Sequence, residues 1–267
     1  MKIRSNNPFD AANDLRQSIG WINPSDFSLE EVAGSLGIGI REVQSMGSEG
    51  RILMNRNSGI ISLNSAINNQ KKNNFTIAHE IGHFLLHKDL VFFSDTHKTL
   101  SEWHRKGPQE TQANEFASEL LMPSNLFSTK VRGKKLNISL MEEVSSYFNV
   151  SRLAAFLKYI PLGSYPVMII FMENGIVKWK RFSDDFPFQF LPLNSAVPAY
   201  TVAGDYFYHG NLESEPEEID AIEWFPEDYK VHKKRTGNFG NNVIRFLRKD
   251  WFHVSGHIEV IVNSTFL

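Results

Sequence analysis

Cysteine is absent from this chain of 267 residues, so disulfide bonds and thiolate metal sites are excluded. Any bound metal must therefore take nitrogen and oxygen ligands. No stretch reaches the ~20 apolar residues of a membrane-spanning helix, and the N-terminus lacks the apolar core of a signal sequence. The net charge of −2 gives no general attraction to nucleic acid. We therefore expect a cytoplasmic protein that does not contact the membrane.

The most informative motif is an H-E-x-x-H pentapeptide, His79-Glu80-Ile81-Gly82-His83. Apolar residues recur at helical spacing from Phe75 to Leu85, and Asn73-Asn74 precede them as a predicted helix cap. Histidines four residues apart stand on one face of a helix, where both imidazoles can bind one metal ion. The glutamate between them can take a proton from a water held there. The alternative is an amphipathic helix whose histidines are ordinary core or surface residues.

Two other residues of this helix carry predictions. Gly82 costs roughly 1 kcal/mol in a helix interior relative to alanine, so we expect a close contact that excludes a side chain. His87 lies one turn after His83, but successive turns rise about 5.4 Å, which places His87 too far from His79 to share an ion. We interpret His87 as a structural residue or as a support for the metal ligands.

A catalytic zinc site usually has three protein ligands and leaves one position open to water. Glu110 is the best candidate for the third ligand, in a second predicted helix that begins near Pro108 and stops before Pro123. Small or apolar residues and one amide share its face: Ala113, Asn114, Ala117 and Leu121. A carboxylate on the buried side of a helix needs a partner, and a metal ion would be one.

Polar residues around Glu110 allow more than one interpretation. Asn114 is predicted to accept a hydrogen bond from the second ring nitrogen of a ligating histidine, or to bond to nearby backbone instead. Glu115 and Glu119 are predicted on a solvated face. His104 lies in a loop over residues 88–107 that we expect beside the site. It is a candidate to stabilise the oxyanion of an attacked peptide bond, and the alternative is a polar surface histidine.

The segments Phe75–His87 and Glu110–Pro123 resemble the ImmA/IrrE family of metallopeptidases nearly residue for residue, within a resemblance that covers roughly residues 25–160. The resemblance implies that His79, His83 and Glu110 bind one Zn2+ per chain and that Glu80 is the general base. This chain has Asn114 where the broader gluzincin group often has aspartate, and an amide is a weaker acceptor.

The resemblance also implies a substrate. The protein would be an endopeptidase that cleaves a helix-turn-helix (XRE-type) transcriptional repressor or an antitoxin and so relieves repression, in a stress response or in induction of a mobile element. Direct contact with nucleic acid is not expected. Two alternatives from other classes are a non-catalytic metal-binding regulator or sensor, and a DNA-binding transcription regulator whose metal site is structural.

We predict an α+β fold in three parts. Residues 1–135 would form a zincin-like metallopeptidase domain, in which a helix opened by the capping box Ser28–Glu31 precedes a small sheet and the H-E-x-x-H helix. The predicted strands of this sheet are Val43–Met46, Arg51–Asn55 and Ile60–Leu63.

Residues 136–162 are predicted to form a helix-turn-helix-like segment. A second capping box, Ser139–Glu142, would open a helix through Phe148, and Ser151 would cap a helix to Tyr159. Arg152 and Lys158 are the only charged residues of the second helix, whereas a groove-reading helix needs several polar or basic side chains. We favour a packing or substrate-docking role over DNA contact.

Residues 163–267 are predicted to form a β-rich domain. Val167–Met172 and Ile176–Phe182 flank Glu173-Asn174-Gly175 in a hairpin pattern, and Ile258–Val262 is a predicted strand. An acidic segment over residues 213–228 and the basic run that follows it are interpreted as solvated loops. Sensing or substrate recognition is the role that the family's domain layout implies for this region.

Overall fold

The structure, a computed structural model, describes residues 6–44, 48–55, 57–87, 107–210, 217–228, 242–248 and 256–263. Helices and strands occur throughout these ranges, which confirms the predicted α+β class. The chain forms two compact units: Met1–Phe127 with Ser145–Ser151, and Ser128–Val144 with Arg152–Leu267. The division into 1–135, 136–162 and 163–267 stays a prediction. None of the helices in the described ranges has the length and apolar character needed to cross a bilayer.

The sheet of the first unit has the strand order β1-β3-β2. Its strands are β1 (Ile38–Val43), β2 (Gly50–Met54) and β3 (Gly59–Asn64). β1 runs parallel to β3, and β2 runs antiparallel to it. Our prediction for the first strand, Val43–Met46, was wrong in its start, since β1 ends at Val43, and its residues Ser45 and Met46 lie outside the described residues. Gly37 adopts a φ of 75° and turns the chain at once, so that β1 pairs with β3 from Ile38 onward.

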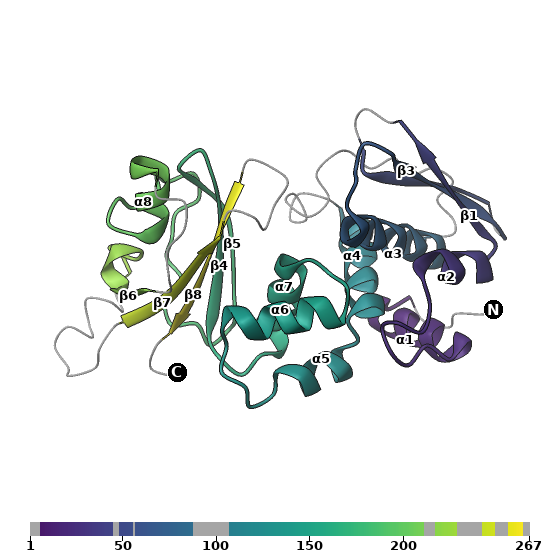
Figure 1. The fold of residues 1–267 in the computed structure, drawn as a ribbon, viewed down its shortest axis with the longest axis horizontal. Coiled ribbons are helices and arrows are strands. Elements are labelled where there is room, and N and C mark those ends of the chain that lie inside the picture. Colours follow the sequence, from purple (N-terminus) through teal and green to yellow (C-terminus); the bar gives the residue numbers. More distant parts are fainter. Residues whose placement is uncertain are drawn as a thin grey trace. The chain divides into compact units, whose positions relative to one another are not determined.

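Five helices contribute to the first unit or lead out of it: α1 (Pro8–Ile19), α2 (Leu29–Ser35), α3 (Gln70–Leu86), α4 (Pro108–Leu121) and α5 (Ser124–Val131). The capping box at Ser28 and Glu31 is confirmed at the start of α2. α3 packs against β2 and β3 and also against α1 and α4. Figure 1 shows α3 between the sheet and α1, with α4 beside it. The predicted bounds of the second helix, near Pro108 and before Pro123, agree with α4.

α3 begins one turn earlier than predicted. Asn69, not Asn73-Asn74, is the cap, and its side chain accepts a hydrogen bond from the Lys72 amide at 3.1 Å. Asn74 lies inside the helix, where its Oδ1 accepts from Gln70 Nε2 at 2.8 Å. Several asparagines in this stretch can cap a helix, and tertiary packing selects among them.

The predicted helix pair is present as α6 (Ile138–Tyr147) and α7 (Arg152–Leu162). Asn149, with a φ of 50°, lies in the turn between them. The predicted capping box at Ser139 was wrong, because the Asn137 side chain accepts from the Leu140 amide at 2.8 Å and Ser139 lies within the helix. α7 also runs past Tyr159, with Pro161 in its last turn.

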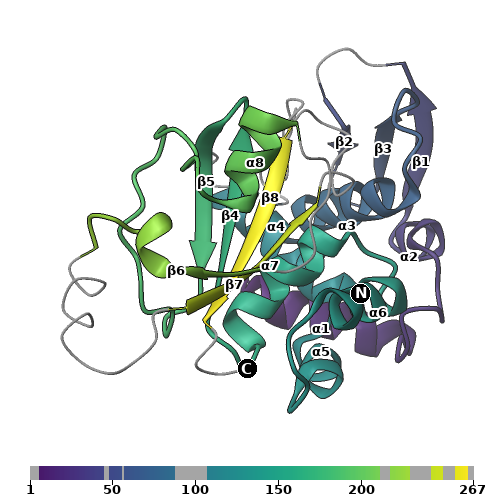
Figure 2. The ribbon, with the colours of Figure 1, turned by 60° about the vertical axis from the view of Figure 1, so that its left-hand side comes forward.

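The second unit contains an antiparallel sheet of strand order β5-β4-β8-β7-β6, seen with α8 in Figure 2. The elements are β4 (Val167–Glu173), β5 (Ile176–Phe182), α8 (Val202–His209), β6 (Glu217–Asp220), η2 (Ala221–Glu223), β7 (Asn242–Arg248) and β8 (Gly256–Asn263). The hairpin of β4 and β5 and the late strand in β8 are confirmed.

β4 is buried on both faces. Met168, Ile170 and Met172 contribute to one hydrophobic cluster, and the intervening Val167, Ile169 and Phe171 are also buried. α7 packs against β4 and β5. Trp224 and Phe225 belong to the cluster and are fully buried, so our interpretation of their segment as a solvated loop was wrong there. Two large aromatic side chains bury enough apolar surface to hold this acidic segment against the sheet.

Candidate metal centre

Three potential metal ligands from two helices converge in the first unit. His79 and His83 lie on α3, and their Nε2 atoms are 3.0 Å apart. Glu110, in the first turn of α4, places Oε2 3.5 Å from His79 Nε2 and Oε1 3.2 Å from His83 Nε2. Tetrahedral ligands about 2.0–2.1 Å from a zinc ion lie about 3.3–3.4 Å from one another. The ligand atoms of this cluster, defined as His79, His83 and Glu110, therefore fit around one such ion.

A close helix crossing brings Glu110 to the histidines. A Cβ added to Gly82 would lie 3.2 Å from the Ala113 Cα and 3.0 Å from a ring carbon of Phe116. This confirms the expectation that Gly82 faces a contact too close for a side chain. Ala113 lies one turn after Glu110 on α4, and His83 directly follows Gly82 on α3. The glycine thus sets the distance between the helices at the level of the cluster.

The cluster is buried and carries a carboxylate that stays ionised. His79 and His83 are 1% and 0% exposed, and the Glu110 side chain is 12% exposed. Burial alone would raise the pKa of Glu110, but hydrogen bonds and charge from both histidines outweigh it and hold that pKa well below its usual range. An ionised carboxylate beside two imidazoles is a donor set that suits zinc.

Asn114 contacts the first histidine from α4. Its Oδ1 lies 3.0 Å from His79 Nδ1, and both residues are buried. An amide oxygen can only accept, so His79 Nδ1 donates to it, and Nε2 is the ring nitrogen that faces the cluster. This is the contact that we predicted for Asn114; its effect on metal binding stays a prediction.

His87 contacts the second histidine. Its Nδ1 lies 3.1 Å from His83 Nδ1, and its Nε2 lies 2.9 Å from Gln112 Oε1. We did not predict a role for Gln112, because it lies off the helix face that carries Glu110 and Asn114. Its role is visible only once the crossing of α3 and α4 is known. In the sequence, only the polar character of Gln112 and its position two residues after Glu110 point to such a role.

Of the two other predicted site residues, Glu80 lies within the described residues and His104 does not. Glu80 is 2% exposed and directly follows His79 on α3. Its role as general base stays a prediction. His104, the candidate oxyanion stabiliser, lies outside the described residues.

Comparison with known proteins identifies the first part of the chain. Residues 33–157 match the IrrE N-terminal-like domain, a peptidase family. Metallopeptidase ImmA of Bacillus subtilis strain 168 is 32% identical over 108 residues, which cover 40% of this chain and 58% of that protein. Residues 33–157 are thus similar to the ImmA/IrrE family of metallopeptidases. The matched range agrees with the resemblance expected over roughly residues 25–160.

A solved structure shares the fold of this chain. The Mycobacterium tuberculosis transcriptional regulator has a TM-score of 0.59 and covers 97% of this chain and 76% of its own, at 12% sequence identity. At that identity the likeness shows the fold alone.

Glu119 caps a helix instead of facing solvent. It is 3% exposed, and its carboxylate accepts from the Ser124 amide at 2.9 Å and from the Ser124 hydroxyl at 2.6 Å. The chain turns after α4, so that Ser124, the first residue of α5, contacts this carboxylate. Our prediction of a solvated Glu119 was therefore wrong. Glu115 is half-buried, and burial raises its pKa.

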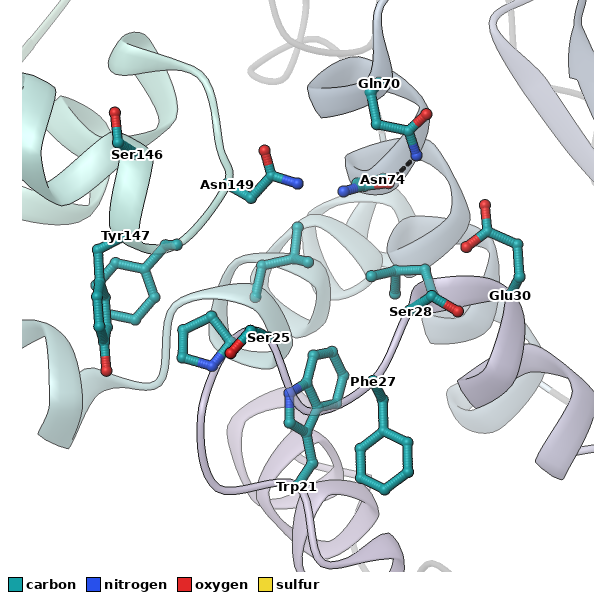
Figure 3. A pocket seen from close by; sticks show the side chains of 14 residues that line it. Trp21, Ser25, Phe27, Ser28, Glu30, Gln70, Asn74, Ser146, Tyr147 and Asn149 are labelled. Atoms are coloured by element: carbon teal, nitrogen blue, oxygen red, sulfur yellow. Dashed lines mark hydrogen bonds between the residues drawn. The ribbon is translucent and has the colours of Figure 1, made fainter.

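A separate hollow of about 390 Å3 lies in the first unit. Aromatic and amide side chains line it, including Trp21, Asn74, Tyr147 and Asn149 (Figure 3). Its lining shares no residue with the cluster of His79, His83 and Glu110, as far as the described part of the chain extends. The turn that follows α6 therefore contributes side chains to a recess of the first unit.

Proposed function

We propose that this protein is a zinc-dependent endopeptidase in which His79, His83 and Glu110 bind the metal. The observation that carries the proposal is the convergence of their ligand atoms at 3.0–3.5 Å, close to the spacing of tetrahedral zinc ligands. Similarity of residues 33–157 to the ImmA/IrrE family of metallopeptidases supports the reaction class. The chain spans 58% of the length of its ImmA relative.

The residues around the cluster would have separate roles in the reaction. A zinc ion held there would act as a Lewis acid and lower the pKa of a water toward ~7. Glu80 would accept the proton of the attacking water and pass it to the leaving amine of the cleaved peptide bond. Asn114 would keep the proton of His79 on Nδ1 and leave Nε2 available to the metal.

We also propose that the substrate is a helix-turn-helix repressor or antitoxin, whose cleavage relieves repression. The family resemblance supports this proposal, which fits a stress response or induction of a mobile element. Features of α7 favour a protein partner over DNA. Arg152 Nε lies 3.6 Å from Glu142 Oε1, and Lys158 is 6% exposed. The two charged side chains of this helix are thus engaged or buried, which leaves little to read a DNA groove.

The test compares wild type with Glu80→Gln in zinc content and in cleavage of a repressor encoded beside the gene. We expect equal zinc binding, one cut by the wild type, and a loss of cleavage of about 10²–10⁴-fold or more in the variant. Glu143→Gln is the matched control, because the Glu143 side chain is 55% exposed.

Each other outcome removes a specific part of the proposal. Full cleavage by Glu80→Gln removes Glu80 from the mechanism, and a wild type that binds no zinc removes the metal site. Zinc binding without cleavage supports a non-catalytic regulator or sensor. Specific binding to operator DNA supports a transcription regulator.

A further inference from the structure

We propose that the hollow lined by Trp21 and Asn149 is part of a groove that binds an extended segment of the protein substrate, away from the metal cluster. The inference rests on the proposed function and adds a docking site to it. A second hollow of about 280 Å3 adjoins the first, because Glu30 and Gln70 line both. These two hollows, here called the docking groove, suit a long and narrow ligand better than a compact one.

One side of the first hollow is apolar and held in place by its neighbours. Trp21, Leu121 and Phe148 line it, and each is at most 5% exposed. The Arg16 guanidinium lies 4.6 Å from the centre of the Trp21 ring and donates to the Leu120 carbonyl at 2.9 Å. A surface fixed in this way is preformed, so an apolar side chain can bind to it without the cost of ordering it.

Carboxamide groups face the same hollow. Asn74 is 8% exposed, and its Oδ1 accepts from Gln70 Nε2 at 2.8 Å. Its NH2 group has no hydrogen-bond partner in the described part of the chain. Figure 3 shows this NH2 group and that of Asn149 pointing toward each other across the hollow. A nearly buried donor without an acceptor costs free energy, which favours a ligand that supplies acceptors.

A peptide backbone supplies the groups that these side chains can bind. Each peptide bond has one carbonyl acceptor and one N–H donor, and a carboxamide has the same pair of functions. The NH2 groups of Asn74 and Asn149 can therefore donate to backbone carbonyls whatever the sequence of the bound segment. An extended chain rises about 3.3 Å per residue, so a short segment is long enough to lie in both hollows.

The charge of the second hollow favours a basic side chain in that segment. Two carboxylates, Glu30 and Glu42, line it together with one guanidinium, that of Arg41. Arg41 Nε donates to Ser62 Oγ at 3.0 Å, on the neighbouring strand. Lysine or arginine in the bound segment would be attracted to the carboxylates, and salt would weaken this attraction. The expected segment thus has an apolar residue for the first hollow and a basic residue for the second.

Two substitutions test the docking groove without touching the cluster. Asn149→Gly removes the carboxamide and tolerates the φ of 50° at this position, and Glu30→Lys reverses a charge. The repressor encoded beside the gene is titrated onto the zinc-free protein, so that binding is measured without cleavage. We expect Asn149→Gly to weaken binding ~2–10-fold. Glu30→Lys should weaken it by at least as much, with a difference from wild type that shrinks as salt rises.

Matched controls make the same changes outside the docking groove. Asn194→Gly replaces another asparagine of positive φ, 62°, in the second unit. Glu143→Lys reverses the charge of a side chain that is 55% exposed on α6. Both control variants should bind the repressor like wild type.

Cleavage by the zinc-loaded protein separates docking from chemistry. For the intact repressor we expect KM to rise in Asn149→Gly and Glu30→Lys while kcat stays at the wild-type value, because the docking groove would contact substrate and transition state equally. For a short peptide that contains only the cut site, both constants should equal those of wild type.

The remaining outcomes each decide one question. Repressor affinity equal to wild type in both folded variants would overturn the docking groove, and so would a wild type that binds no repressor. A wild type that binds the repressor but does not cut it would overturn only the proposed function. Self-association of the wild type that both variants abolish would assign the groove to a second copy of the chain. A small molecule seen on the wild type by native mass spectrometry, and lost from both variants, would assign it to an effector, and either result would overturn the peptide.

Discussion

Gly82 and Ala113 touch across the crossing of α3 and α4, where a Cβ on the glycine would come within 3.2 Å of the Ala113 Cα. Gly82 directly precedes one histidine of the cluster, and Ala113 lies one turn after Glu110. The two helices therefore approach each other closely at the level of the ligands. Any change in their separation alters the distance between Glu110 and the imidazoles.

Gly82→Ala should weaken zinc binding and lower stability. Alanine would gain about 1 kcal/mol of helix propensity, but overpacking costs typically ~1–3 kcal/mol, and α4 must move away from α3. Thermal unfolding and a zinc titration measure the two effects. Gly34→Ala is the control, since a Cβ there meets nothing within 4 Å and should stabilise α2. Unchanged zinc affinity in a folded Gly82→Ala protein would show that the crossing does not position Glu110.

Substitutions of Asn114 test its contact with His79. Asn114→Leu removes the acceptor of the Nδ1 proton and should weaken zinc binding ~10–100-fold. Asn114→Asp replaces the amide with a stronger acceptor, so we expect affinity equal to or above that of wild type. Chelator competition gives both constants. If leucine and asparagine give the same affinity, the 3.0 Å contact has no part in metal binding.

The lowered pKa of Glu110 predicts a pH-dependent contribution to stability in the zinc-free protein. A carboxylate whose pKa is lower in the folded state stabilises the fold above its unfolded pKa of ~4.3 and loses this contribution as the pH falls through the folded value. The free energies of unfolding in urea of wild type and Glu110→Gln should therefore differ most near neutral pH. The difference should shrink on acidification. If the difference in the free energy of unfolding grew toward low pH, it would contradict this prediction.

Glu119→Ala should destabilise the fold without changing the cluster. The substitution removes the acceptor of the Ser124 amide and hydroxyl at the start of α5, a loss that typically costs ~1–2 kcal/mol. Chemical unfolding gives the free energy, and zinc content should stay at the wild-type level. Glu115→Ala is the matched control: Glu115 is half-buried and its pKa is raised, so we expect a smaller loss. An equal loss in both variants would argue against the cap.

The sequence predicted those features that depend on local spacing. Two histidines four residues apart share a helix face wherever that helix packs, and Glu110 was found because its face is otherwise small or apolar. The capping box at Ser28 needs only residues within one turn.

Features that depend on tertiary contact were missed. Asn69 was not distinguished from Asn73 as the cap of α3, because each can cap a helix and packing decides between them. Gln112 and Glu119 are polar residues on a helix whose partners, His87 and Ser124, lie on other elements. The hydrophobicity pattern of the sequence does not indicate that Gln112 contacts His87 or that Glu119 contacts Ser124.

Residues Ser145–Ser151 return to the first unit after the chain has entered the second. Within that unit the Phe148 ring stacks on Phe127, with centroids 5.9 Å apart. A fragment cut at residue 135 would keep His79, His83 and Glu110 but lose this aromatic partner and part of the wall of the hollow. A fragment that preserves the first unit must therefore extend past residue 151, and it carries all of α6 with it, although only the last turn of that helix belongs to the unit.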